Sequence, residues 1–492
     1  MRKAMIIIIS LCVILTAVVT ANASGETKLN FTVVFKSERL PDNVHDLISG
    51  LGGKILTTIP EIGVVQVEAA PAFARTALKS REIQSATPSL VEVLPKDHRK
   101  IDTSSLNIGD AALYNMYQWD IKRVTQNGSA FGLGTGSHDV VVGVIDTGVD
   151  LNHPDLQANL VGGSKNFVPA GGFYGNDLSE TGNIADVQDR FGHGSHVTGN
   201  IAGKGSILGV APDVGYRSYR VMGGTGGSYS TWIAQAMVAA ANDGTDIISI
   251  SFTGINIKGQ VWYTDPGTGE KIRLGNDIAD YLVYMRAANY ADRKGSLIVA
   301  AAGNDALNSS NKKDVTDYAN GIYGQYGYTF VGASLPAPAS LPNVVTVSAT
   351  GPDDQLALYS NYGPGFIDVA APGGDYRLYL NTPEDERTAE NVFAKEFCLS
   401  SVPFIEPVYS PDQTVITGYN YRSPGYAFNI GTSMATPKAS AVAALIISRH
   451  GKLPPSRIKE MLQKTAEDIG KTGYDSSFGH GMVSSSNALG QK

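Results

Sequence analysis

The pattern of apolar positions divides the chain of 492 residues into a short first unit and a long second one. In the first unit, apolar runs and alternation predict two helices, at 43–51 and 71–81, and four strands, at 29–35, 54–59, 64–69 and 89–95. The resulting order, β-α-β-β-α-β, is the ferredoxin-like arrangement. We therefore expect a small α+β unit over residues 28–95.

In the second unit, continuously apolar strands alternate with helices. Strands are predicted at 139–145, 216–222, 246–251, 296–303, 343–349 and 366–371, and helices at 193–203, 230–243, 278–295 and 435–450. The run DVVVGVI (139–145) is apolar after its first residue, as in a parallel strand buried on both faces. Short connections between alternating strands and helices predict an α/β fold with a doubly wound, mostly parallel sheet. The stretches 255–275 and 375–427, rich in Tyr, Pro, Gly and charge, are interpreted as surface insertions.

The N-terminus has the pattern of a signal peptide. Arg2 and Lys3 precede an apolar run, and Ala21-Asn22-Ala23 follows as a small-residue cleavage site. A membrane anchor of marginal length is the alternative. We expect removal of residues 1–23 and a secreted, extracellular protein that does not contact the membrane after the signal is removed.

A polar stretch without periodicity, 96–110, follows the small unit and predicts an exposed linker. A small unit behind a signal peptide, tied to a large domain by such a linker, suggests a prosegment; an accessory binding domain is the alternative. The expected organisation is a signal peptide (1–23), a propeptide (24–100), a linker with the processing site (101–118) and the main domain (119–492).

Composition narrows the classes of function. A hydrophobic content of 42% and a charged content of 17% are typical of a soluble globular protein with a sizeable core. The net charge of −7 gives no support for nucleic acid as a partner. Once the signal peptide leaves, Cys398 is the one remaining cysteine, so an internal disulfide is excluded. We expect Cys398 to be buried or idle, because it lacks the helix-start or Gly-rich setting of a nucleophile.

Three polar residues stand where strands end or helices begin. Asp146 ends the buried strand at 139–145, His193 lies between glycines before a helix, and Ser433 precedes the apolar helix at 435–450, whose Pro437 would fall in its first turn. Singly, Asp146 could form a turn and Ser433 could be an N-cap. Together they supply an orienting carboxylate, a base and a nucleophile. Asn304, after the strand at 296–303, could form a turn or donate its amide to an oxyanion.

Two other chemistries are conceivable for these residues. His193 and His196, three residues apart, could hold zinc with Asp186 or Asp189, but that would leave Asp146 and Ser433 unexplained. His196 also lies one turn into an apolar helix, which favours a core histidine. Asp146-Thr147-Gly148 matches the aspartic-protease signature, but the signature occurs once and that mechanism needs two.

At these residues the chain resembles the subtilisin-like serine proteases, or subtilases. The matching segments are VIDTGVDLNHPDL (144–156), GHGSHVTG (192–199), LGVAP (208–212), AAAGN (300–304), PNVVTVSA (342–349), GTSMATPKASA (431–441) and FGHGMV (478–483). The resemblance covers roughly residues 120–490, and the unit at 28–95 looks like the inhibitory, chaperone-like propeptide of that family. It therefore implies a subtilisin-like fold and serine endopeptidase activity on peptide or protein substrates, with the propeptide as intramolecular inhibitor.

The resemblance also assigns roles. It implies that Ser433 is the nucleophile, His193 the general base and then acid, Asp146 its orienter, and Asn304 the oxyanion donor. The backbone of Ser251, Phe252, Thr253 and Gly254 resembles the edge that pairs with an extended substrate. The family often has Ser-Leu-Gly-Gly there, so Phe252 and Thr253 leave the side-chain preference open.

The family needs no cofactor for catalysis, and no metal ligands are predicted here. The segment GKGSILGVAP (203–212) is shorter than the calcium-holding loop of the secreted degradative subtilisins and lacks its Asn-rich ligands. A structural calcium site is therefore not assumed.

Within the family, QWDIKRVTQNGSA (118–130), YRVMGG (219–224) and IADYLVYMRAANYADRKG (278–295) resemble the peptidases that remove leader peptides from lantibiotics. The sequence leaves leader-peptide maturation and general secreted proteolysis open. It predicts a secreted, self-processing serine endopeptidase; the alternative is a catalytically silent subtilase that binds extended peptides.

Overall fold

The computed structural model describes residues 20–21, 27–89, 91–94, 99–101, 109–264, 269–276 and 279–490. Most of the predicted signal peptide and much of the predicted linker lie outside these ranges. No helix of the described residues has the length and apolarity needed to cross a membrane.

The first unit is a four-stranded antiparallel sheet with two helices, and a two-residue strand pairs with the start of one of its central strands. Its elements are β1 (Thr20–Ala21), β2 (Thr27–Phe35), α1 (Val44–Gly50), β3 (Lys54–Ile59), β4 (Val64–Ala69), α2 (Phe73–Ala77) and β5 (Ile83–Pro88). Strand β2 lies between β4 and β5, and β3 pairs with β4, which is the ferredoxin-like strand order. The sheet and helices enclose their own apolar core, which includes Phe31, Val67 and Phe73.

A strand is present within the predicted range 89–95, but the prediction that it completes this sheet was wrong. The strand that completes this sheet is β5, and the next strand, β6 (Val91–Val93), pairs with β11 (Gly227–Tyr229) of the large domain instead. An alternating segment has the same pattern whichever sheet it joins, so the choice of partner rests on tertiary packing.

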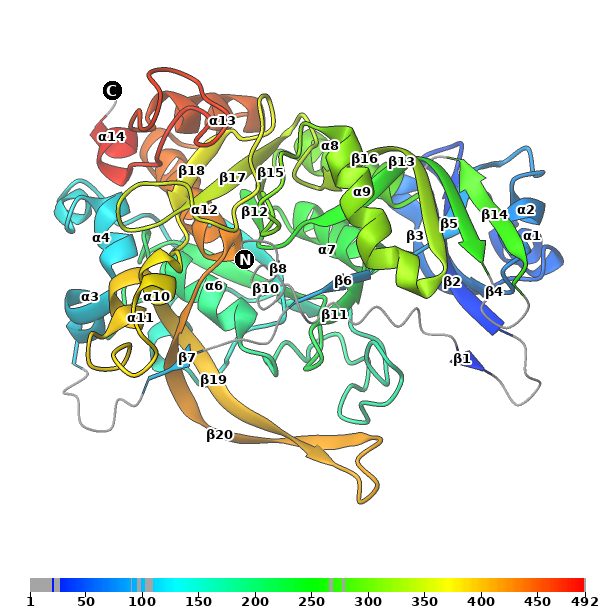
Figure 1. Ribbon diagram of the computed structural model, residues 1–492, viewed down its shortest axis with the longest axis horizontal. Helices are drawn as coiled ribbons and strands as arrows, with labels where there is room; N and C mark the ends of the chain where they lie inside the picture. Colours follow the sequence, from blue (N-terminus) through cyan, green and yellow to red (C-terminus); the bar gives the residue numbers. More distant parts are fainter. Residues whose placement is uncertain are drawn as a thin grey trace.

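A parallel sheet of seven strands forms the centre of the large domain (Figure 1). In spatial order the strands are β18 (Val369–Pro372), β17 (Val344–Thr350), β15 (Leu297–Ala301), β12 (Ile247–Ile250), β8 (Val141–Asp146), β10 (Gly215–Arg220) and β9 (Lys165–Asn166). Every pairing in it is parallel, which confirms the predicted doubly wound α/β fold.

Each face of the sheet carries a separate apolar core. Val142 and Val144 of β8 point into a core shared with α6 (His193–Ala202) and α12 (Thr432–His450). Ile145 points to the other face, into a core shared with α7 (Ser230–Asn242) and α8 (Ala279–Lys294). Because successive side chains alternate across the sheet, a strand buried on both faces must be apolar throughout.

Six further helices of the large domain are α3 (Ala112–Tyr117), α4 (Trp119–Thr125), α5 (Pro154–Gln157), α9 (Lys312–Tyr323), α13 (Pro455–Lys464) and α14 (Ser485–Gly490).

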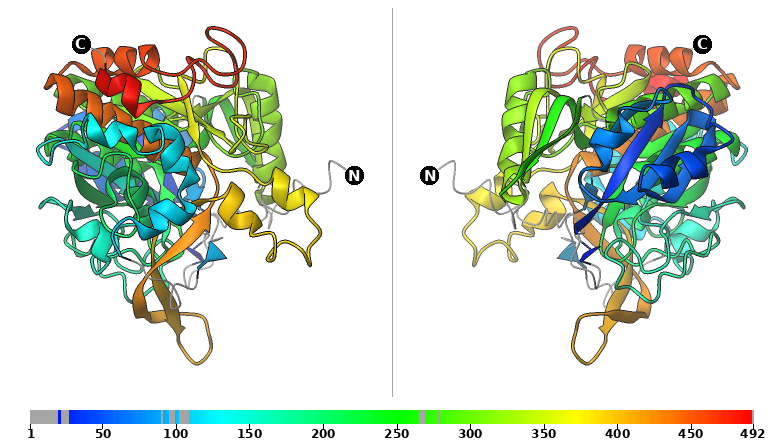
Figure 2. Two further views of the ribbon diagram at one scale, coloured as in Figure 1. Left: turned by 90° about the vertical axis from the view of Figure 1, so that its left-hand side faces the viewer. Right: turned by 90° about the vertical axis from the view of Figure 1, so that its right-hand side faces the viewer.

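Both predicted insertions have regular structure. The first contributes β13 (Gly254–Thr264) and β14 (Lys271–Asn276), which form an antiparallel sheet with β16 (Tyr328–Ala337). The second contains α10 (Arg377–Asn381), α11 (Val392–Glu396) and a hairpin of β19 (Cys398–Tyr409) and β20 (Ile416–Asn429). Figures 1 and 2 show this hairpin projecting from the body of the molecule.

The small unit packs against the large domain through polar contacts from its sheet to α8 (Figure 2). Thr32 donates a hydrogen bond of 2.6 Å to the buried carboxylate of Asp280. Arg286 donates to the backbone oxygens of Phe35 (2.7 Å) and Ile62 (2.8 Å). These contacts place β6, which follows the small unit, beside the carboxyl ends of the central strands.

Candidate active site

Asp146 and His193 form a buried pair at the carboxyl end of β8. Asp146 is the last residue of β8 and His193 is the first of α6, whose N-cap is Gly192. His193 Nδ1 lies 2.8 Å and 3.0 Å from the two carboxylate oxygens of Asp146, and Thr147 N donates to the same carboxylate at 2.7 Å. The hydrogen bonds satisfy a carboxylate that would be costly to bury alone. Asp146 therefore holds the imidazole through Nδ1, which leaves Nε2 for chemistry.

Ser433 lies inside the first turn of α12. The helix begins at Thr432 with Gly431 as N-cap, so the alternative that Ser433 is the cap was wrong. The helix also begins earlier than predicted, and Pro437 falls in its second turn rather than its first. The Ser433 hydroxyl donates to the carbonyl of Ser251 at 2.6 Å, and within the described residues it makes no hydrogen bond to His193.

Asn304 lies where its amide can face a ligand. Its Oδ1 accepts from the backbone N–H (2.9 Å) and the hydroxyl (2.9 Å) of Thr432, which leaves Nδ2 as the outward donor. Gly431 has a positive φ of 149°, and the place a Cβ would occupy there lies 3.5 Å from both Asn304 Nδ2 and the Ser433 backbone nitrogen. Two N–H donors thus converge on a space that the missing side chain of Gly431 leaves open, as an oxyanion site requires.

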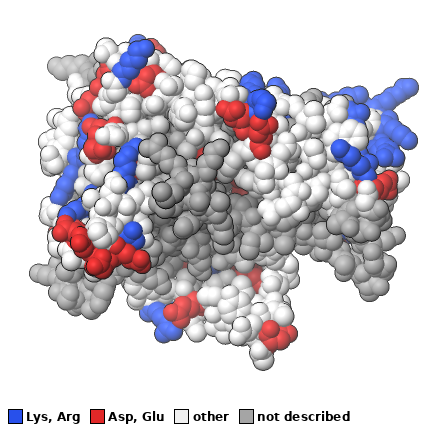
Figure 3. All heavy atoms as spheres, viewed as in Figure 1, with Lys and Arg blue, Asp and Glu red and all other residues white. Residues whose placement is uncertain are grey.

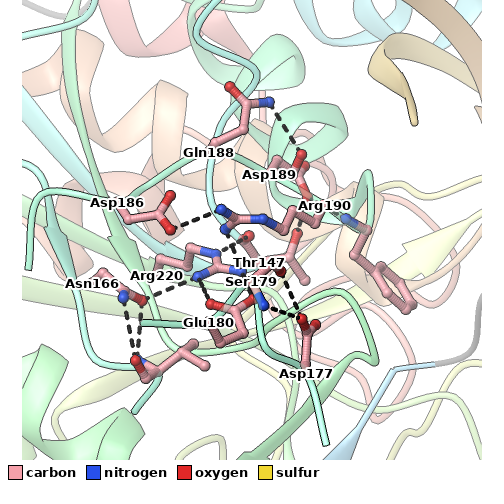
Figure 4. Close-up of polar contacts among 12 residues, drawn as sticks. Thr147, Asn166, Asp177, Ser179, Glu180, Asp186, Gln188, Asp189, Arg190 and Arg220 are labelled. Atoms are coloured by element: carbon pink, nitrogen blue, oxygen red, sulfur yellow. Dashed lines mark hydrogen bonds and ion pairs between the residues drawn. The ribbon is translucent and has the colours of Figure 1, made fainter. Parts of the chain in front are cut away.

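Asp189 holds the chain on both sides of the pair. Thr147, next to Asp146, donates its hydroxyl to Asp189 at 2.9 Å and accepts from Gly194 N at 2.8 Å (Figure 4). The Asp189 carboxylate also accepts from Ser195 N (2.9 Å) and from the backbone of the residues before His193. The strand end and the helix start are therefore joined through one buried carboxylate, a positioning role that the sequence did not indicate.

A buried ion pair between Arg220 and Glu180 contacts the backbone next to Asp146. Arg220, the last residue of β10, lies opposite Asp146 in the sheet register. Its guanidinium makes two bonds to Glu180, one of 2.7 Å, and donates from Nε to the carbonyl of Thr147 at 3.2 Å (Figure 4). Both charged side chains are 0% exposed. Arg190 adds a second cation 3.8 Å from Glu180.

The contacts of the histidines do not fit the zinc alternative. His193 Nδ1 is bound to Asp146, and His196 Nε2 lies 3.2 Å and 3.1 Å from the backbone oxygens of Cys398 and Ala427. Asp189 is occupied by the N–H and O–H donors described above. His196 is therefore a hydrogen-bonded core histidine. Cys398 is buried, as expected, and its burial raises the pKa of the thiol well above the ordinary value.

The predicted substrate edge, Ser251 to Gly254, lies beside the serine. Ser251 and Phe252 are buried, the Ser251 carbonyl accepts from Ser433, and Gly254 begins β13. The Thr253 hydroxyl has no hydrogen-bond partner among the described residues.

Sequence reasoning missed a second edge, β11. Val93 pairs with Gly227 and Val91 with Tyr229 in antiparallel register, and Leu94 N donates to Gly226 O at 3.0 Å. The carboxyl group of Glu92 lies against Gly254, where a Cβ would meet Oε1 at 1.7 Å. An extended segment of the chain thus lies between β11 and Gly254. The Gly-rich GGTGGSY (223–229) after β10 was the available signal.

Comparison with known proteins assigns the family. Residues 137–481 match the model of the subtilase family, peptidase S8. The chain belongs to the subtilase family. It is 32% identical over 396 residues to the nisin leader peptide-processing serine protease NisP of Lactococcus lactis, over 80% of this chain and 52% of that relative. It is 29% identical to the epidermin leader peptide-processing serine protease EpiP of Staphylococcus epidermidis, over 86% of each chain.

Solved structures agree with this assignment. The EpiP crystal structure from Staphylococcus aureus has a TM-score of 0.75 and 30% identity, covering 95% of this chain and all of that one. The nisin leader peptidase from L. lactis has a TM-score of 0.62 and 29% identity, covering 77% and 95%. The subtilisin-like fold is confirmed, and the expected class of enzyme, a serine endopeptidase, is the class of these relatives. The chain spans about half the length of the curated NisP relative.

Proposed function

We propose that the chain is a secreted serine endopeptidase, made as a self-processing zymogen, that cleaves peptide bonds through Ser433, His193 and Asp146. The observation that carries the proposal is the docking of residues 91–94 as a strand on β11, with Glu92 against Gly254 of the edge whose Ser251 carbonyl contacts Ser433. A cleft that holds an extended peptide next to an Asp-His pair and a helix-start serine has what acyl transfer needs. We propose that the chemistry needs no cofactor.

The proposed reaction begins when the Ser433 hydroxyl turns from the Ser251 carbonyl toward His193. Its oxygen attacks the substrate carbonyl while His193 Nε2 takes the proton, and Asp146 stabilises the imidazolium through Nδ1. The oxyanion accepts from Asn304 Nδ2 and the Ser433 backbone N–H. His193 then protonates the leaving amine, and water releases the acyl group by the reverse sequence.

The order of the segments supports the proposal of secretion and self-processing. The predicted signal peptide precedes the small unit, which is bound to α8 through Thr32 and places residues 91–94 in the cleft. A propeptide so placed blocks the cleft until it is cut and released. The printed names of two relatives add a more specific substrate class, the leader peptides of lantibiotics. We propose leader-peptide removal as the first function to test, with general proteolysis as its alternative.

The test is the intact mass and N-terminal sequence of wild type and Ser433→Ala, each purified from a protease-deficient host. The proposal expects wild type to lose the residues before its processing site and Ser433→Ala to stay uncut apart from its signal peptide. Processing of both variants at the same rate would refute self-processing. A catalytically silent protein would leave both uncut, and Ser433 would then not react with a phosphonylating reagent.

A further inference from the structure

Two short segments on either side of 95–98 are held by different parts of the large domain. Before it, β6 pairs with β11, and Leu94 N donates to Gly226 O. After it, β7 (Arg99–Lys100) pairs with β20, with Arg99 opposite Phe428 and Lys100 opposite Ala427. Figure 1 draws β6 beside β11 and β7 alongside the hairpin. Two residues of the polar stretch predicted to be an exposed linker, 99–100, are therefore a bound strand.

The pairing of β6 with β11 is the first docking point, and the pairing of β7 with β20 is the second. The two docking points lie on either side of the proposed nucleophile, Ser433. Strand β20 ends at Asn429, four residues before Ser433, and the Ser433 hydroxyl bonds to Ser251, at the start of the edge that ends at Gly254. Five residue steps separate Leu94 from Arg99, a span of at most about 17 Å for an extended chain. A peptide that occupies both points must cross the region of Ser433 between them.

The second docking point has backbone and apolar contacts. Ile101 N donates to Tyr426 O at 3.1 Å, which continues the pairing of β7 by one residue. The half-buried Ile101 side chain packs against an apolar cluster. The buried members of that cluster are Leu113, Ile207, Phe397, Leu399, Tyr426 and Phe428. An aliphatic side chain at this place removes apolar surface from water on both partners.

The edge of β20 that carries these contacts is short. In antiparallel pairing, the backbone N–H and C=O groups of alternate residues point toward the neighbouring strand. Those of Phe428 and Tyr426 point toward β7, and Pro424 is the next residue in this alternation. Proline has no N–H, and it blocks further pairing of an edge. The site is therefore restricted to the three residues before Asn429, close to the nucleophile.

Charge on the surrounding surface fits the same segment. An exposed acidic stretch, Glu384, Asp385, Glu386 and Glu390, precedes α11, whose Phe393 and Ala394 pack against the cluster that receives Ile101. Figure 3 shows acidic side chains gathered at the lower left of the molecule, the side on which Figure 1 draws α10 and α11. In the sequence, β7 (Arg99–Lys100) is basic and therefore opposite in charge to this acidic stretch.

We propose that β20 and this apolar cluster form a substrate-binding site for residues beyond the scissile bond, which rests on the proposed function. A substrate forms a short strand that pairs with Ala427 and Phe428, as β7 does. If one substrate residue binds where Leu94 binds, the residue seven positions later binds where Ile101 binds and is aliphatic. Basic residues just before that aliphatic residue are favoured. For the chain itself, the processing bond then lies between Leu94 and Arg99, before the linker at 101–118 that was predicted to hold it.

The test measures cleavage of fluorogenic peptides that span residues 88–104 by the processed wild-type enzyme. Ile101→Asp in the peptide removes the aliphatic group, and N-methylation at Ile101 removes the bond to Tyr426. The matched controls are Ile101→Leu and N-methylation at Lys100, whose N–H faces away from β20 by the same alternation. We expect the first two changes each to lower kcat/KM about three- to tenfold and the controls to change it less than twofold.

The other outcomes separate the two levels of the proposal. Equal cleavage of all peptides, including one truncated after residue 98, would overturn the site and leave the protease assignment intact. If no peptide is cut, the same peptides are compared as inhibitors of casein hydrolysis, which ranks their affinities for the enzyme. Equal inhibition by all of them would overturn the site. Failure to hydrolyse casein, with Ser433 inert to a phosphonylating reagent, would overturn the proposed function itself.

Discussion

The fully buried pair of Arg220 and Glu180 gives a quantitative prediction about the support of the active site. Glu180→Gln removes the anionic partner but keeps one acceptor, so one of the two bonds from Arg220 to Glu180 is lost. The guanidinium then remains charged and 0% exposed without its anionic partner, whereas Arg190 loses its longer ion pair to Glu180 but keeps the one to Asp186. Removing one partner of a buried pair costs about 3–5 kcal/mol. Because Gln retains one bond, we expect about 3 kcal/mol.

The assay is thermal unfolding in the Ser433→Ala background, which prevents self-digestion. With an unfolding entropy of about 2 cal/mol/K per residue, 3 kcal/mol in a chain of this length lowers Tm by about 3 °C. Glu406→Gln is the matched control, because Glu406 pairs with Arg422 at the surface, where the two side chains are 51% and 63% exposed. Loss of an exposed pair should cost at most about 1 kcal/mol, or about 1 °C.

A double variant separates lost charge compensation from lost packing. Glu180→Met with Arg220→Met leaves no unpaired charge, so it should destabilise the protein less than Glu180→Gln alone. With Ser433 intact, Glu180→Gln should also lower kcat/KM, because Arg220 supports the Thr147 carbonyl beside Asp146. Equal melting of Glu180→Gln and Glu406→Gln would refute the reasoning, as would a double variant less stable than the single one.

Three further predictions concern the cleft. Asn304→Ala should lower kcat about 10²–10³-fold with little change in KM in steady-state hydrolysis, which is the known cost of the same loss in another subtilase. An unchanged kcat would show that Asn304 does not donate to the oxyanion. Gly431→Ala should have a similar effect because its Cβ enters that site, whereas Gly321→Ala, with no atom within 4 Å, should be neutral; equal activities would contradict the geometry. Burial, with the carboxylates of Asp280 and Asp305, raises the pKa of Glu92 to about 8. Docked Glu92 therefore keeps a proton that the free residue loses near pH 4.5, so docking favours the protonated form. The measurement is inhibition of the processed enzyme by a peptide of residues 88–94. Inhibition should weaken from pH 4.5 to 8, by at most about tenfold per pH unit, and should not change further above pH 8. Glu92→Gln should remove this dependence, and an unchanged pH profile would exclude Glu92 as its source.

The central sheet and the residues at its carboxyl end were predictable because local pattern determines them. Val142, Val144 and Ile145 are apolar on both faces of β8, which is what a central parallel strand requires. Asp146 and His193 follow from the strand end and the Gly-flanked helix start. Their closeness follows from the fold, since 47 residues separate them.

The contacts that support and fill the site were not predictable, because they join residues without a shared local pattern. Arg220 and Glu180 are 40 residues apart, and Glu180 lies in an irregular segment whose polar sequence is typical of any surface loop. Strand β6 has the alternation of a strand in the small unit, but tertiary packing pairs it with β11. In β20, Gly418, Pro424 and Gly425 interrupt the alternation that would have indicated a hairpin.

The most direct test of the central claim, that Ser433 is an activated nucleophile, is to treat the processed enzyme with a phosphonylating serine reagent and map the adduct by peptide mass spectrometry. The account predicts one adduct, on Ser433, with parallel loss of hydrolysis. It also predicts that His193→Ala, freed of its propeptide by added protease, reacts at least about a thousandfold more slowly. An adduct on another residue, or full hydrolysis with Ser433 unmodified, would contradict it.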